Sequence, residues 1–251
     1  MIDWNETHAA VWRRRNGTLR PVRRIDHVQL DDLLGIDRQK RALVANTERF
    51  LHRQPANNVL LWGSRGTGKS SLIKALLNAY ANQGLRVIEI DKDDLVDLPE
   101  IVDDIRELSH RFIIFCDDLS FEEGETTYKH LKSVLEGSIE LPPENVLVYA
   151  TSNRRHLIPE RQSENQDVKI VDGELHYGDT VEEKLSLADR FGLWLSFYPC
   201  TTGQYLAIVD TLFSQYQGDR SELHGKAKQF AMERASKSGR TAKQFFLTYH
   251  G

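Results

Sequence analysis

The sequence predicts an α/β fold: a parallel sheet covered by helices on both faces, followed by a small helical domain. Short apolar runs alternate with amphipathic segments between residues 59 and 200, which is the pattern of parallel strands joined by crossover helices. Polar residues directly follow several of the apolar runs, as expected at the carboxyl edge of such a sheet. The apolar runs stop at Pro199, and residues 203–250 are typical of three helices, broken near Gly218 and near Ser238-Gly239.

Each expected element follows from the spacing of its apolar residues and from the residues at its ends. Buried strands are expected at residues 59–62, 85–90, 112–116, 146–150 and 193–197. Helices are expected at residues 38–53, 69–82, 99–110 and 126–135. Residues 160–180 interrupt the alternation. Within them, the segment 168–177 is typical of a hairpin, because its Asp172-Gly173 dipeptide favours a tight turn.

Length and composition exclude several classes of protein. The 251 residues suit one large domain, or a domain with a small appendage, and the net charge of −4 provides no strong attraction to DNA or to acidic membranes. The two cysteines, Cys116 and Cys200, are too few for a disulfide framework and are expected to be reduced. The polar start of the chain lacks the apolar core of a signal peptide, and the apolar runs are far shorter than the roughly 20 residues of a membrane span. We therefore expect a cytoplasmic protein that makes no membrane contact.

The first 30 residues form a basic arm that contains two tryptophans. Its arginines are Arg13, Arg14, Arg15, Arg20, Arg23 and Arg24. The favoured interpretation is a solvated arm or a packing strap, and the alternative is a surface for nucleic acid or for an acidic partner. Because the arm is short and carries no recognition motif, sequence-specific binding of nucleic acid is not expected.

Residues 63–70, Gly-Ser-Arg-Gly-Thr-Gly-Lys-Ser, satisfy the complete phosphate-loop pattern. Glycines let the backbone turn tightly so that its N–H groups surround phosphate oxygens, and the helix that begins at Lys69 adds its positive end. Lys69 is expected to reach the β- and γ-phosphates, and Ser70 to ligate Mg²⁺. We expect ATP or ADP to be bound by Gly63, Ser64, Arg65, Gly66, Thr67, Gly68, Lys69, Ser70 and Ser71.

The expected strand at residues 112–116 ends in two aspartates and has the form of a Walker B segment. A buried strand of this kind delivers carboxylates to the mouth of the phosphate site. We expect Asp117 to hold Mg²⁺, directly or through water, and Asp118 to orient or activate the attacking water. Asp118 is one methylene shorter than the glutamate that often stands at this position, so Glu122 and Glu123 are further candidates for the same task.

Asn153 is the last residue of the polar segment Thr151-Ser152-Asn153, which follows the expected strand at residues 146–150. Its amide is expected to hydrogen-bond the γ-phosphate or to position water, as a fixed dipole near developing charge. The alternative is that Asn153 simply forms a turn, for which asparagine is favoured after a strand.

Taken together, these motifs resemble those of the AAA+ ATPases over about residues 30–251. The run Glu-Lys-Leu-Ser-Leu-Ala-Asp-Arg-Phe-Gly at 183–192 further resembles a bacterial family of predicted AAA+ ATPases, known mainly as a domain of unknown function. The resemblance implies three parts: a basic arm at 1–30, a nucleotide-binding domain at 31–200 with a hairpin insert at about 160–180, and a helical lid at 201–251.

The resemblance also implies roles for three residues outside the strand ends. Arg190 corresponds to an arginine finger, which enters the ATP site of a neighbouring subunit, and Arg240 corresponds to the sensor-2 arginine of the lid. Ile36, in the segment Leu33-Leu34-Gly35-Ile36, corresponds to a residue that packs around adenine. The alternatives are that Arg190 is an ion-pair partner of Asp189 or of a nearby glutamate, and that Arg240 is an exposed residue at a helix start.

We therefore expect Mg²⁺-dependent ATP hydrolysis in a homo-oligomer, either a ring or a dimer, that remodels or loads an unidentified protein partner. The first alternative is an ATP-dependent binding switch with little turnover. A P-loop kinase is the weaker alternative, because Asn153, Arg190 and a lid of several helices are not typical of one.

Overall fold

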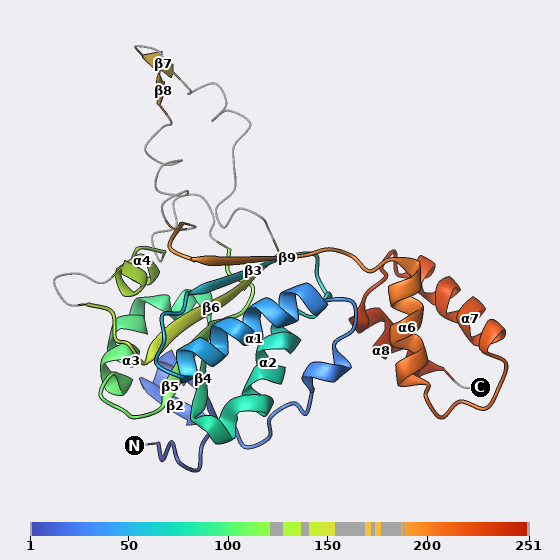
Figure 1. The fold of residues 1–251 in the computed structure, drawn as a ribbon, viewed down its shortest axis with the longest axis horizontal. Coiled ribbons are helices and arrows are strands. Elements are labelled where there is room, and N and C mark those ends of the chain that lie inside the picture. The colour runs from blue at the N-terminus through green and yellow to red at the C-terminus, as the bar shows by residue number, and fades with distance from the viewer. Residues whose placement is uncertain are drawn as a thin grey trace.

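The computed structural model describes residues 2–120, 128–136, 141–153, 169–171, 174–176, 187 and 189–249. Its core is a seven-stranded sheet in the order β2-β1-β4-β5-β6-β3-β9, in which every neighbouring pair is parallel except β1 and β2 (Figure 1). The strands are β1 (Ala9–Arg13), β2 (Thr18–Pro21), β3 (Val59–Gly63), β4 (Leu85–Ile90), β5 (Arg111–Cys116), β6 (Val146–Ser152) and β9 (Leu193–Phe197). The predicted α/β fold is thereby confirmed.

Helices cover both faces of the sheet, because each strand sends alternate side chains to opposite sides. On one face, α1 and α2 pack in a cluster that includes Leu43, Leu72 and Phe115, and on the other face α3 and α4 pack with Phe112 and Leu131. The bounds of these helices are α1 (Asp37–Leu51), α2 (Lys69–Tyr80), α3 (Leu98–Ile105) and α4 (Tyr128–Glu136). Helix α3 ends five residues earlier than predicted.

Three further helices form a separate small body at the C-terminal end of the chain (Figure 1). They are α6 (Thr202–Leu212), α7 (Arg220–Glu233) and α8 (Gly239–Thr248), which match the three predicted helices. Their own core includes Tyr205, Phe213 and Phe245, with Phe213 centred 5.5 Å from Phe245. The described residues contain no helix long and apolar enough to cross a bilayer.

The structure adds two strands that the sequence pattern does not predict, and both lie within the arginine-rich arm. Strand β1 extends the sheet beside β4, and Ala9 and Ala10 contribute to the cores on its two faces. The Trp12 indole N–H donates to Asp97 Oδ2 at 3.0 Å. The arm therefore packs against the domain, while its arginines are exposed. The division of the chain into three domains stays a prediction.

Strands β7 (Lys169–Val171) and β8 (Glu174–His176) pair antiparallel where the hairpin is expected. Its turn residues, Asp172 and Gly173, lie outside the described part of the chain, as do Glu122 and Glu123.

A buried hydrogen-bond network joins α1 to the centre of the sheet. The Tyr149 hydroxyl, on a fully buried side chain of β6, lies 3.0 Å from Asn46 Nδ2, which donates to it, and 2.9 Å from Thr47 Oγ1. The amide of Asn46 also binds the backbone of Asn57 through both of its polar atoms. These bonds satisfy polar groups that would be costly to bury alone.

Replacing Tyr149 with phenylalanine removes one hydroxyl and takes a partner from two buried groups. We expect Tyr149→Phe to lower the free energy of unfolding by about 1–3 kcal/mol, the usual cost of unsatisfied buried polar groups. Urea unfolding followed by circular dichroism measures this change. The matched control is Tyr198→Phe, which alters a side chain in a residue that is 68% exposed and should have little effect. An equal loss in both variants would contradict a stabilising role for the network.

Candidate functional site

The phosphate loop follows β3 and is held against the end of β9. A side-chain Cβ placed on Gly63, which has φ +129°, would lie 2.0 Å from the carbonyl oxygen of Phe197. The next backbone N–H, that of Ser64, donates to the same oxygen at 3.0 Å. Gly63 is therefore required by the close approach of two backbones as well as by the shape of a phosphate loop.

Lys69, the first residue of α2, lies folded back over this loop. Its Nζ donates to the carbonyl oxygens of Gly63 at 2.7 Å and Ser64 at 2.8 Å, and to Asn153 Oδ1 at 3.1 Å. The residue is 7% exposed, and burial lowers the pKa of its amine, while the charges of Asp117 and Asp118 act in the opposite direction. Lys69 thus places a cationic group at the mouth of the loop.

Ser70 and Asp117 meet where α2 begins and β5 ends. Ser70 Oγ donates to Asp117 Oδ1 at 2.7 Å, and Thr151 Oγ1 donates to the same carboxylate oxygen. Hydroxyl and carboxylate oxygens are the hard ligands that Mg²⁺ prefers. Among the described residues no group of three or more histidines, cysteines or acidic residues could hold a metal alone. The pair therefore fits an ion that also takes water or phosphate oxygens as ligands.

Asp118 and Asn153 lie side by side at the ends of β5 and β6. Asn153 Nδ2 donates to Asp118 Oδ1, while its Oδ1 accepts from Lys69, so one amide bridges the lysine and the carboxylate. Asp118 has a left-handed backbone with φ 55°, and its N–H donates to Thr151 Oγ1 at 2.9 Å. Its second oxygen forms an ion pair with Arg65 Nη2 at 3.7 Å. Lys69, Asp117, Asp118 and Asn153 thus form one connected cluster.

The start of α8 packs on the phosphate loop. A Cβ added to Gly66 would lie 2.9 Å from Ser238 Oγ and 3.3 Å from Arg240 Cβ. Ser238 caps α8 by accepting from the Thr241 N–H at 3.2 Å, so its position is fixed by the helix. Arg240 is exposed, and its charge contributes to lowering the pKa of Lys69. The structure therefore brings Arg240 to the loop.

Ile36 lies at the start of α1, next to the same loop. Its Cδ1 would be 3.5 Å from a Cβ on Gly68, and the residue is 9% exposed. The preceding carbonyl, that of Gly35, accepts from Gln204 of α6 at 3.5 Å. Ile36 is thus placed between the phosphate loop and the helical body.

The structure pairs Arg190 with Glu136, the last residue of α4. The side chain of Arg190 is 15% exposed and that of Glu136 is 43% exposed. This pairing corresponds to the ion-pair alternative left open by the sequence.

Two residues make contacts in the cluster that were not expected from the sequence. Thr151 binds both the carboxylate of Asp117 and the backbone N–H of Asp118, and Arg65 pairs with Asp118. The signal for Thr151 is its place in the polar end of β6, one residue before the buried Ser152. Arg65 occupies a variable position of the phosphate-loop pattern, which provides no signal for its partner.

The contact between Gly66 and Ser238 can be tested by adding one methyl group. Gly66 has φ +75°, so Gly66→Ala strains the backbone and displaces the cap of α8. We expect the affinity for a fluorescent ATP analogue to fall at least about tenfold, since the loop and Arg240 both move. The control is Gly84→Ala, at φ +92°, whose added Cβ meets no atom within 4 Å. It should lose stability and keep its affinity; similar losses of affinity in both variants would contradict this prediction.

Comparison with known proteins identifies the family and the fold. The family described as "Protein of unknown function (DUF815)" matches residues 5–251. The chain is 35% identical over 115 residues to the 26S proteasome regulatory subunit 6B homolog of Schizosaccharomyces pombe, a match that covers 40% of this chain and 29% of that protein. The chain thus corresponds to less than a third of that relative's length.

Two solved structures, both of RuvB variants from Thermotoga maritima, superpose with a TM-score of 0.51. Their sequence identity to this chain is 14% and 13%. The matches cover 86% and 88% of this chain, and 70% and 71% of the two RuvB chains. At this identity the likeness concerns the fold alone, which is that of the AAA+ ATPases. The chain belongs to the DUF815 family and has a RuvB-like AAA+ fold.

Proposed function

We propose that this chain is a Mg²⁺-dependent ATPase that acts as a homo-oligomer and remodels or loads a protein partner. The observation that carries the proposal is the bridge made by Asn153, which binds the loop lysine Lys69 with one atom and the carboxylate of Asp118 with the other. A fixed dipole between a phosphate-binding cation and a carboxylate suits hydrolysis of a terminal phosphate, because it holds both groups in place around the reacting atoms.

In this proposal the phosphate loop holds the nucleotide and Lys69 moves from the carbonyl oxygens of Gly63 and Ser64 to phosphate oxygens. Ser70 and Asp117 would hold Mg²⁺. When bound with the nucleotide, the ion would neutralise charge on the β- and γ-phosphate oxygens. Ile36 packs against the adenine ring.

Asp118 accepts a hydrogen bond from the attacking water and orients it for in-line attack on the γ-phosphate. It takes up the proton of that water as the bond from the γ-phosphorus to ADP breaks. Asn153 fixes the position of that carboxylate and donates to the water or to a γ-phosphate oxygen. Arg240 reaches the nucleotide from α8, because its Cβ already lies beside the loop. Its guanidinium stabilises the charge that develops in the transition state and reports the presence of the γ-phosphate to the lid.

Asp118→Asn separates binding from hydrolysis. We expect this variant to bind ATP with nearly unchanged affinity and to hydrolyse it at least about a hundredfold more slowly, because the amide cannot accept a proton from water. Isothermal titration with ATP and a phosphate-release assay measure the two quantities. Lys69→Ala is the control, since it should lose binding itself. Full turnover by Asp118→Asn would contradict the role given to this carboxylate.

Arg190 is proposed to act in a neighbouring subunit, after it leaves Glu136. A Lys69→Ala subunit keeps its Arg190, and an Arg190→Ala subunit keeps its phosphate loop. We expect each variant alone to lose at least about a hundredfold in rate per subunit, because the loop lysine and an arginine finger both stabilise the charge of the transition state. An equimolar mixture should recover activity well above the sum of the two, because mixed oligomers place an intact arginine beside an intact loop.

Glu136→Gln is the matched control for this mixing experiment, because it removes the ion pair and keeps Arg190. It should retain activity, and the wild-type rate per subunit should rise with protein concentration. If Glu136→Gln loses as much activity as Arg190→Ala and the mixture recovers nothing, Arg190 is a structural partner of Glu136 and the trans role is wrong.

A second candidate function, a binding switch with little turnover, is favoured by one contact. The carboxylate of Asp118 is engaged by Arg65 on one oxygen and by Asn153 on the other. If this pairing persists with ATP bound, Arg65 and Asn153 compete with the attacking water for the acceptor sites of this carboxylate. Absence of turnover, together with a partner affinity that differs between ATP and ADP, would establish the switch. Partners that Asp118→Asn captures with ATP, and Lys69→Ala does not, are the proteins on which to make that comparison.

A further inference from the structure

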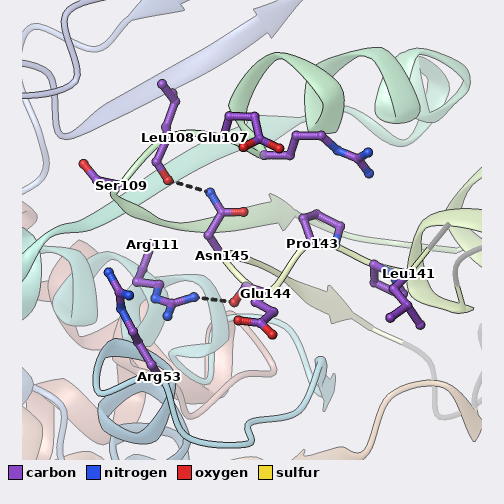
Figure 2. Close-up of a pocket in the computed structure, with 11 residues that line it drawn as sticks. Arg53, Glu107, Leu108, Ser109, Arg111, Leu141, Pro143, Glu144 and Asn145 are labelled. Carbon is purple, nitrogen blue, oxygen red and sulfur yellow. Dashed lines mark hydrogen bonds between the residues drawn. The ribbon is translucent and has the colours of Figure 1, made fainter.

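A pocket of about 450 Å³ lies at the opposite end of the sheet from the phosphate loop (Figure 2). Strand β5 runs from Arg111 in this pocket to Cys116, the residue before Asp117 of the nucleotide site. Strand β6 runs from Val146, the residue after Asn145, to Ser152, the residue before Asn153. The remaining walls come from the end of α1, the turn after α3 and the segment that precedes β6. None of these residues belongs to the site described above.

Two arginines from different elements converge at one end of the pocket (Figure 2). Arg111 is 8% exposed; its guanidinium lies 5.3 Å from the centre of the Phe50 ring and donates to the carbonyl oxygen of Glu144. Burial lowers the pKa of Arg111 and the charge of Arg53 lowers it further, while the charge of Glu144 acts in the opposite direction. Arg53 is exposed and has a left-handed backbone with φ 59°. A carboxylate that lies between two guanidinium groups forms charge-assisted hydrogen bonds with both of them.

Asn145 places an unsatisfied acceptor in the same pocket. It is 9% exposed, and its Nδ2 donates to the carbonyl oxygens of Ile105 at 2.9 Å and Leu108 at 3.0 Å. Its Oδ1 has no hydrogen-bond partner among the described residues, and Figure 2 shows it directed to the side of Pro143. A buried acceptor of this kind is costly, so a ligand that brings an N–H group gains free energy by binding there.

The rest of the lining decides the class of ligand. Leu141, which is 84% exposed, and Pro143 form an apolar wall. Among the described residues that line the pocket there is no aromatic side chain on which a nucleobase could stack. Glu107 and Glu144 oppose a ligand with several negative charges. A single carboxylate beside an apolar group and an N–H donor matches all of these features.

We propose that this pocket binds a short acidic peptide segment of a partner protein. The carboxylate of a glutamate or aspartate lies between Arg53 and Arg111, a main-chain N–H donates to Asn145 Oδ1, and a neighbouring apolar side chain packs on Leu141. This docking site goes beyond the proposed hydrolysis of ATP and does not depend on it.

The test uses the full chain labelled with nitrogen-15, without nucleotide, and the dipeptide N-acetyl-Glu-Leu-amide as the probe. We expect the side-chain signals of Asn145 and Arg111 to shift in nuclear magnetic resonance spectra and to saturate. N-acetyl-Gln-Leu-amide should bind at least about tenfold more weakly, because its neutral amide replaces the carboxylate that would accept charge-assisted hydrogen bonds from the arginines. The absence of saturable shifts up to the solubility limit of the dipeptide would overturn the proposal.

Variants at exposed positions keep the fold intact and test the two halves of the site. Arg53→Gln and Leu141→Ser should each weaken binding of the Glu dipeptide severalfold or more. Arg41 is an exposed residue of α1, the helix that precedes Arg53, and it lies outside the pocket. Arg41→Gln should therefore leave the binding of the Glu dipeptide unchanged. Inorganic phosphate serves as the competing anion. Tighter binding of phosphate than of the dipeptide at the same signals, or equal weakening by Arg41→Gln, would contradict recognition of a peptide carboxylate.

Discussion

The carbonyl oxygen of Phe197 occupies the space where a side chain on residue 63 would lie, and the arrangement of the nucleotide site depends on this contact. A Cβ at Gly63 would be 2.0 Å from that oxygen, and the N–H of Ser64 donates to it. The loop therefore begins in register with the end of β9. The same strand leads to Thr201, which caps α6, so the position of the helical body is set by the strand that holds the loop.

On its other side the loop meets α8, again at a glycine. Gly66 lies against Ser238, and Ser238 Oγ is held by the N–H and the hydroxyl of Thr241. A change in the loop backbone on binding phosphate must therefore displace the cap of α8 or be opposed by it. Helix α8 shares a core with α6 and α7, so a displacement at this point is expected to be passed on to the other two helices. In the proposed function, this contact would connect a bound nucleotide to the helical body.

The sequence predicted the parts of the site that follow from chain direction. Parallel strands end at one edge of the sheet, so the residues after 112–116 and 146–150 had to meet the loop that follows β3. The bond of Thr151 and the ion pair of Arg65 depend on side-chain conformations, which no spacing specifies. Strands β1 and β2 were missed because arginines and short length hide their alternation, and pairing with β4 supplies the stability. The pairing of Arg190 with Glu136 was likewise not predictable, because it depends on the tertiary structure.

The proposed peptide pocket and the nucleotide site contact opposite ends of the same two buried strands. Asp117 follows Arg111 by six positions in an extended chain, so about 20 Å separates the two residues. The two strands are packed on both faces, and close-packed strands resist small displacements. The contacts expected to change with nucleotide lie instead at Gly66 and α8, which do not line the pocket. A peptide docked there would therefore stay bound while the lid moves, so that the partner is held by the rigid sheet and acted on by the helical body.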